Sequence, residues 1–186
     1  MNCRAWRSEM EPSLSIGELE KRMRPGAWSE AGVLGPRESL HAVLAGDHQA
    51  LDRLGLSYEA IARALEGVLQ QALDQRDKLL RTDYDQYWQR EMHIPDLSRP
   101  ESIPRFSPAN LPSVDVGYLV GDRYQVFIAQ YRGVQECPWG CEFDRWSSFN
   151  FLLLNRKSAE YVTGPGLIVH LIREHRFFEG KESPYR

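Results

Sequence analysis

Apolar side chains recur every three or four positions through the first half of the chain, which is the spacing of helices buried on one face. Ser15 and Glu18 match a capping box, and the short helix that they open would end at Pro25. Ser57 precedes a second and much longer apolar stripe. We therefore predict one long amphipathic helix over residues 58–92, capped by Ser57.

Two shorter helices are predicted between these. Pro36 suits the first turn of one helix, whose buried stripe would include Leu40 and Val43. Gly46-Asp47 is expected to interrupt the helical pattern, so that Asp47 caps the next helix. Gly55 supplies the left-handed position that commonly follows a helix C-terminus.

Prolines dominate residues 93–113, where they occupy five of the 21 positions. Proline fixes φ and removes a backbone donor, so this stretch favours extended chain over helix. Phe106 and Leu111 indicate that the connector lies along a protein surface. We expect it to separate a helical region, 1–92, from a sheet-containing region, 114–186.

The last part of the chain alternates apolar and polar positions, which is the period of β-strands. One hairpin is predicted from runs at 114–120 and 123–132, around a turn at Gly121-Asp122. A second pair of strands is predicted at 147–154 and 159–163.

A final helix is predicted over residues 167–175, after the breaker Gly164-Pro165-Gly166. The expected fold class is therefore α+β. It begins with N-terminal helices, one of them long and amphipathic, and continues as an antiparallel β-meander with a cysteine-containing knuckle, Cys137 to Cys141, and a C-terminal helix.

Composition narrows the class of protein without indicating an activity. Hydrophobic residues make up 42% and charged residues 26%, which is typical of a globular domain. A net charge of -3 disfavours a mainly electrostatic partner such as nucleic acid or a membrane surface. No apolar run approaches the roughly 20 residues that span a bilayer, and the first residues lack the apolar core of a signal peptide. We expect a cytoplasmic location.

Four side chains carry the clearest chemical signal. Cys137 and Cys141 lie in the run Glu-Cys-Pro-Trp-Gly-Cys, and His170 and His175 lie in the predicted C-terminal helix. Two thiolates and two imidazoles are the ligands of tetrahedral structural zinc, so we predict a Zn²⁺ site at these residues. The alternatives are a disulfide between the cysteines, another metal, or two unrelated pairs of buried side chains.

The arrangement resembles a Cys2His2 zinc finger, in which a knuckle and a strand pair precede a helix that carries two histidines. The resemblance covers about residues 134–178 of the chain. Twenty-eight residues separate Cys141 from His170, whereas the usual gap is about 12. The resemblance therefore implies a finger-like site inside a larger sheet.

The histidine spacing places a constraint on the helix. Five positions along a helix correspond to about 500°, which leaves the side chains of His170 and His175 roughly 140° apart around its axis. Both rings can reach one metal only if the helix widens, tightens or ends near them. The residues after His175 are consistent with a helix that ends there.

Three other functions are alternatives to a structural zinc site. Four protein ligands leave no coordination position for water, which disfavours catalysis; if only three bind, Glu174 becomes a candidate general base for a metal-dependent hydrolase. Residues 167–169, where a base-reading finger would present polar side chains, are apolar. Trp139 and Trp146 are expected to shield the metal, and exposed Trp and Tyr side chains leave single-stranded nucleic-acid binding as a further alternative.

The sequence thus predicts a non-enzymatic, zinc-stabilised protein that acts through a protein partner or as a homodimer. The apolar stripe around Leu65–Leu80 is the expected contact surface, because it is longer than a small sheet can cover. If this helix packs back onto the sheet instead, the chain could be monomeric.

Overall fold

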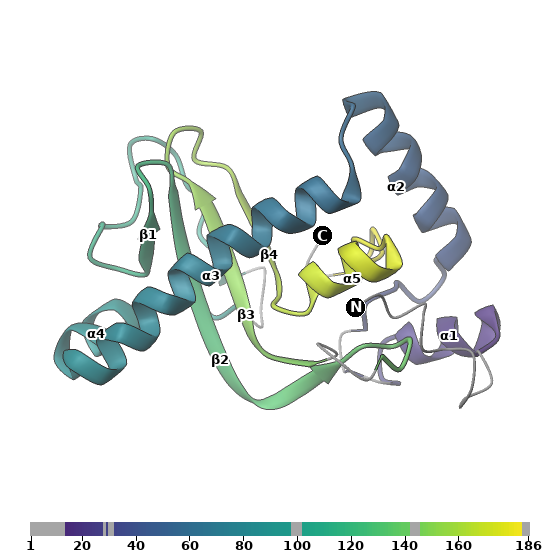
Figure 1. Ribbon diagram of the computed structural model, residues 1–186, viewed down its shortest axis with the longest axis horizontal. Helices are drawn as coiled ribbons and strands as arrows, with labels where there is room; N and C mark the ends of the chain where they lie inside the picture. The colour runs from purple at the N-terminus through teal and green to yellow at the C-terminus, as the bar shows by residue number, and fades with distance from the viewer. Residues whose placement is uncertain (1–13, 28, 30–31, 98–101, 142–145, 184–186) are drawn as a thin grey trace.

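An antiparallel sheet with helices on one face forms the body of the molecule (Figure 1). The computed structural model describes residues 14–27, 29, 32–97, 102–141 and 146–183. Within these residues the chain forms five helices and one four-stranded sheet in the order β1-β2-β3-β4, which confirms the predicted α+β meander. The strands are β1 (Tyr118–Val120), β2 (Tyr124–Glu136), β3 (Trp146–Asn155) and β4 (Tyr161–Pro165). The helices are α1 (Ile16–Met23), α2 (Leu40–Leu54), α3 (Tyr58–Thr82), α4 (Tyr84–Glu91) and α5 (Ile168–His175).

Several local signals act as predicted. Ser15 and Glu18 form the capping box of α1, in which each side chain accepts a hydrogen bond from the other residue's backbone N–H. The Ser57 side chain caps α3 by accepting from the N–H of Ala60. Gly55 follows α2 with φ +64°, the left-handed conformation that glycine adopts without a steric cost.

The predicted interruption at Gly46-Asp47 is wrong, because α2 runs unbroken through both residues. A glycine inside a helix costs only about 1 kcal/mol relative to alanine. The apolar face of α2, which buries Leu40, Val43 and Leu51, gains more than this by packing as one continuous helix. Asp47 is itself buried on that helix and is not a cap.

The single helix predicted over residues 58–92 is also wrong, because it is divided at Asp83. The backbone of Asp83 is extended (φ −153°, ψ 83°), although its N–H still donates to the carbonyl of Leu79 at 2.8 Å. Its side chain accepts from the N–H of Gln86 at 3.0 Å and so begins α4. The change of direction lets α4 bury Tyr87 instead of extending into solvent.

Element bounds in the sheet differ from the predicted runs mainly at β1, which begins at Tyr118 instead of residue 114. Gly117 has φ +63°, a left-handed conformation, so the extended backbone of β1 cannot continue through this residue. A Cβ there would lie 2.6 Å from the carbonyl oxygen of Val126, which explains why the residue is glycine. β2 continues to Glu136, past a shift in its pairing with β3 between Gln130 and Gln135. It therefore leads directly into the cysteine run.

Both faces of the sheet are covered. Alternate residues of β2 point to opposite faces, so that Val126 and Ile128 join the core beneath the helices while Phe127 joins a second cluster. That second cluster contains Leu97 and Ile103 from the proline-rich connector. Phe106 and Leu111 of the same connector pack against this cluster and are partly buried. The prediction that the connector lies along a surface is confirmed.

The apolar stripe of α3 packs inside the chain. Leu69 and Ala72 are buried, and Leu65, Val68 and Leu79 pack against the same core from partly exposed positions. Figure 1 shows α3 crossing the sheet beside α5. In the described part of the chain, no helix is both long and apolar enough to cross a membrane.

Candidate metal centre

The cysteine run forms a tight turn at the end of β2. The N–H of Gly140 donates to the carbonyl of Cys137 at 2.9 Å, and Gly140 adopts φ +73°. This left-handed conformation favours glycine, which explains the glycine before the second cysteine. The turn holds Cys137 and Cys141 on one side of the chain, and both are buried.

α5 brings the two histidines to the same place. Leu171 and Ile172 are buried and fix the apolar face of α5 against the core. His175 is the last residue of the helix, because Arg176 adopts a left-handed conformation (φ +57°) and its N–H donates to the carbonyl of Ile172. The helix thus ends where the histidine spacing requires, and the centroids of the His170 and His175 rings lie 5.2 Å apart.

The four residues selected from the sequence form one cluster. One candidate ligand atom from each of Cys137, Cys141, His170 and His175 lies within 4.8 Å of the others. The Sγ atoms of both cysteines are each 3.3 Å from Nε2 of His175. Tetrahedral zinc with ordinary bond lengths separates a sulfur ligand from a nitrogen ligand by about 3.6 Å, so the cluster could hold a metal ion with small adjustments.

Burial and hydrogen bonding test whether a metal fits. The exposed fractions are 1% for Cys137, 6% for Cys141 and 9% for His170. Nε2 of His170 is buried without a hydrogen-bond partner in the described structure, although an unpaired buried polar atom normally costs about 1–3 kcal/mol. Neither cysteine is in a disulfide. A divalent cation would give the His170 nitrogen a partner, and two thiolates would balance its charge.

Aromatic rings support the cluster on one side. The Trp139 indole is parallel to the His175 ring, with an interplanar angle of 4° and centroids 4.1 Å apart. Phe177, which sequence reasoning missed, meets Trp139 edge-on at 5.5 Å and is fully buried. Its position two residues after His175 was the one available signal of this role. Trp139 therefore lies where it was expected, whereas the side chain of Trp146 is outside the described residues.

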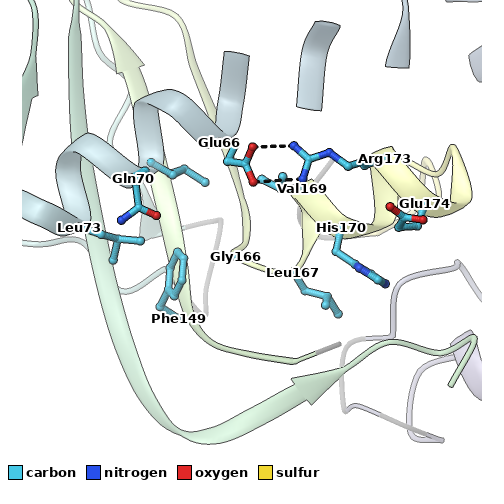
Figure 2. Close-up of a pocket in the computed structure, with 11 residues that line it drawn as sticks. Glu66, Gln70, Leu73, Phe149, Gly166, Leu167, Val169, His170, Arg173 and Glu174 are labelled. Carbon is cyan, nitrogen blue, oxygen red and sulfur yellow. Dashed lines mark hydrogen bonds and ion pairs between the residues drawn. The ribbon is translucent and has the colours of Figure 1, made fainter. Parts of the chain in front are cut away.

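A cleft of about 240 Å³ lies between α3, α5 and Phe149 of β3 (Figure 2). Across it, Arg173 donates two hydrogen bonds to Glu66, at 3.1 and 2.6 Å. These bonds hold the pKa of the Glu66 carboxyl below its ordinary value. Because the Arg173 and Glu66 side chains are 30% and 51% exposed, solvent screens the pair, and it contributes about 0–1 kcal/mol. Its main consequence is to join α5 to α3.

Glu174 was the candidate base of the alternative hydrolase. It lines this cleft and is not part of the four-residue cluster. Figure 2 shows His170 and Glu174 together among the α5 side chains that line the cleft. His170, four residues before Glu174 on α5, also lines the cleft, so this surface reaches one of the four candidate ligands, whereas Glu174 is not among the clustered donors.

Comparisons with known proteins do not extend this description. No protein-family model matches the chain, and neither a curated protein nor a solved structure shows significant similarity to it. The resemblance to Cys2His2 modules rests on the order of the four residues and on their geometry.

Proposed function

We propose that the chain is a zinc-stabilised protein without catalysis at its metal site, and that it acts through contacts with protein. The observation that carries the proposal is the convergence of four buried or half-buried Cys and His donors within 4.8 Å, with the buried Nε2 of His170 lacking a hydrogen-bond partner among the described residues. Cys137, Cys141, His170 and His175 would hold one Zn²⁺.

The donor set favours zinc over other common ions. Thiolate ligands select against Mg²⁺ and Ca²⁺, which prefer oxygen, and a tetrahedral set of two sulfurs and two nitrogens suits Zn²⁺. A reducing compartment such as the cytoplasm would keep both cysteines available as thiolates. Four protein ligands fill the coordination shell, which supports a structural role over a hydrolytic one.

The metal would act as a clasp between distant parts of the chain. The cysteine turn is attached to the end of β2, whereas the histidines lie on α5, which packs against α3 through its buried face. Closing this link with zinc would contribute free energy directly to folding, because the unfolded chain has no preformed site. The zinc would hold α5 at a fixed position on the sheet.

Metal analysis of the purified full chain tests this proposal. We expect one zinc per chain after dialysis, and loss of folded structure when a strong chelator removes it. Cys141→Ser and His170→Ala should lower both zinc content and stability. Cys3→Ser and His48→Ala are matched controls, because Cys3 lies outside the selected set and His48 is exposed on α2. A chain that folds and stays stable without metal would overturn the proposal.

A further inference from the structure

The two edge strands of the sheet, β1 and β4, differ in how their outward backbone groups are used (Figure 1). An edge strand leaves alternate N–H and C=O groups without a neighbouring strand, and proteins commonly cover or block such groups. At β1 the carbonyl of Leu119 accepts a hydrogen bond from the side chain of Gln75 on α3, at 2.8 Å. The helix therefore covers part of the edge at β1.

Hydrogen bonds at both ends of β4 determine which of its residues face outward. The N–H of Asn155 donates to the carbonyl of Glu160 at 2.8 Å, and the N–H of Gly166 donates to the carbonyl of Phe149 at 2.9 Å. In an antiparallel pair of strands, residues that exchange hydrogen bonds with the neighbour alternate with residues that do not. The even-numbered residues of β4 therefore bond to β3, and the odd-numbered residues turn their N–H and C=O groups away from it.

Two residues of β4 present both outward backbone groups to solvent. In the part of the chain that the structure describes, no group forms a hydrogen bond with the outward N–H or C=O of Tyr161 or Thr163. Tyr161 is 38% exposed, and Thr163 is partly exposed. Pro165, the next outward residue, has no N–H and is buried, so it ends the accessible stretch. We call residues 161–163 the open edge.

The side chains beside the open edge add an apolar surface. Val162 is 56% exposed and lies opposite Leu153 of β3, on the face of the sheet that packs against the helices. On the other face, Tyr161 meets Phe106 of the connector edge-on at 5.6 Å. Edge strands that must stay unpaired usually carry a charge or a proline, whereas the open edge carries neither. An added strand would place a side chain directly against Val162 and cover it.

The backbone groups of the open edge select the kind of partner that can cover it. They offer donors and acceptors in the spacing of a β-strand, which an extended peptide backbone matches and a helix or a lipid surface does not. Gly164 and Pro165 are buried directly beyond the open edge. The accessible stretch is therefore better suited to a short extended segment than to the whole sheet edge of a second folded copy.

We propose that the open edge binds an extended segment of a partner protein, which adds a strand antiparallel to β4. The segment exchanges backbone hydrogen bonds with Tyr161 and Thr163, and it places an apolar side chain against Val162. Hydrogen bonds along the main chain provide the affinity, and the residue opposite Val162 provides the preference for sequence. The inference rests on the protein-contact role proposed above and names the partner for it.

Amide hydrogen exchange of the zinc-loaded full chain, measured residue by residue, tests whether the edge is open. We expect the amides of Tyr161 and Thr163 to exchange fast and those of Val162 and Gly164 to be protected, because only the second pair donates to β3. The probe for binding is the capped peptide Lys-Val-Thr-Val-Thr-Val-Lys. Its threonine backbone groups face β4 when one of its valines lies against Val162. The peptide should slow exchange at Tyr161 and Thr163.

One substitution and one pair of modified peptides test the backbone contact. Thr163→Pro removes an outward N–H at an edge position where a sheet tolerates proline, and it should weaken peptide binding by about tenfold or more. Thr163→Val is the matched control, because it keeps the N–H and should bind the peptide normally. N-methylation of the peptide's threonines should abolish binding, whereas N-methylation of its valines, which face away from β4, should not. The peptide comparison leaves the protein unchanged.

Three results would overturn the proposal. They are slow exchange at Tyr161 and Thr163 in the chain without peptide, no peptide binding up to about 1 mM, and equal binding of the two N-methylated peptides. A dimer that protects these amides without peptide places a second copy on the edge and also contradicts it. Zinc content separates the two proposals. One zinc per chain without peptide binding contradicts the open edge alone, and peptide binding by a stable chain without zinc contradicts the metal clasp alone.

Discussion

The Trp139 indole covers one face of the His175 ring, and Trp139→Ala would remove that support from a candidate zinc ligand. Trp139 makes two ring contacts, one with His175 at 4.1 Å and one with Phe177 at 5.5 Å. Aromatic pairs contribute about 0.5–1.5 kcal/mol each beyond the area that they bury, which gives a total of about 1–3 kcal/mol. Because Trp139 is only half-buried, the lower part of this range applies, and we expect zinc affinity to fall by about tenfold.

Competition for zinc with a chromophoric chelator measures this change. Trp139→Phe should keep most of the affinity, because a phenyl ring can still stack on His175. Trp88→Ala is the matched control, since Trp88 lies on α4 and touches none of the candidate ligands. If Trp139→Ala binds zinc as tightly as the unchanged chain, the stacked ring does not position His175 and the reasoning fails.

Four further substitutions test the packing of the fold. Tyr118→Phe removes the hydrogen bond to the partly buried Glu91 and should lower the free energy of unfolding by about 1–3 kcal/mol in urea titrations. Burial raises the pKa of the Glu91 carboxyl above its ordinary value of 4.5. The free energy of unfolding should therefore decline as the pH rises above 4.5, because the folded chain holds this proton more tightly than the unfolded chain does. Glu91→Gln should abolish the decline. Glu38→Ala removes the carboxylate that accepts from the backbone N–H groups of Gly35, Lys181 and Glu182. We expect the free energy of unfolding to fall by about 2 kcal/mol and the amides of Lys181 and Glu182 to exchange hydrogen faster. Gly166→Ala would force a Cβ into the Phe149 ring at the start of α5 and should lower thermal stability by about 1–3 kcal/mol; unchanged stability would contradict this packing.

Structural features that depend on residues close together in the sequence could be predicted from the sequence. The capping box at Ser15 and the left-handed Gly55 follow from local hydrogen bonding and backbone geometry, which need no tertiary information. The prediction that Cys137 and His175 lie in one cluster could also be made from the sequence. Two cysteines followed by two histidines form an ordered set of residue types that is typical of a structural zinc site.

Features decided by tertiary packing could not be predicted. The helical pattern continues through Asp83, but the chain turns there because α4 can then bury Tyr87 and pair Glu91 with Tyr118. Gly46 was expected to end a helix, yet the packing of α2 outweighs its small helix propensity. The contact of Phe177 with Trp139 likewise needs a chain reversal after α5 that no spacing rule indicates.

X-ray absorption spectroscopy of the zinc-loaded full chain tests the central claim most directly. The fine structure reports the identity and distance of the atoms bound to the metal. We predict two sulfur ligands at about 2.3 Å and two nitrogen ligands at about 2.0–2.1 Å, from Cys137, Cys141, His170 and His175. A shell with fewer than two sulfurs, or one that contains a water or carboxylate oxygen, would contradict a closed structural site.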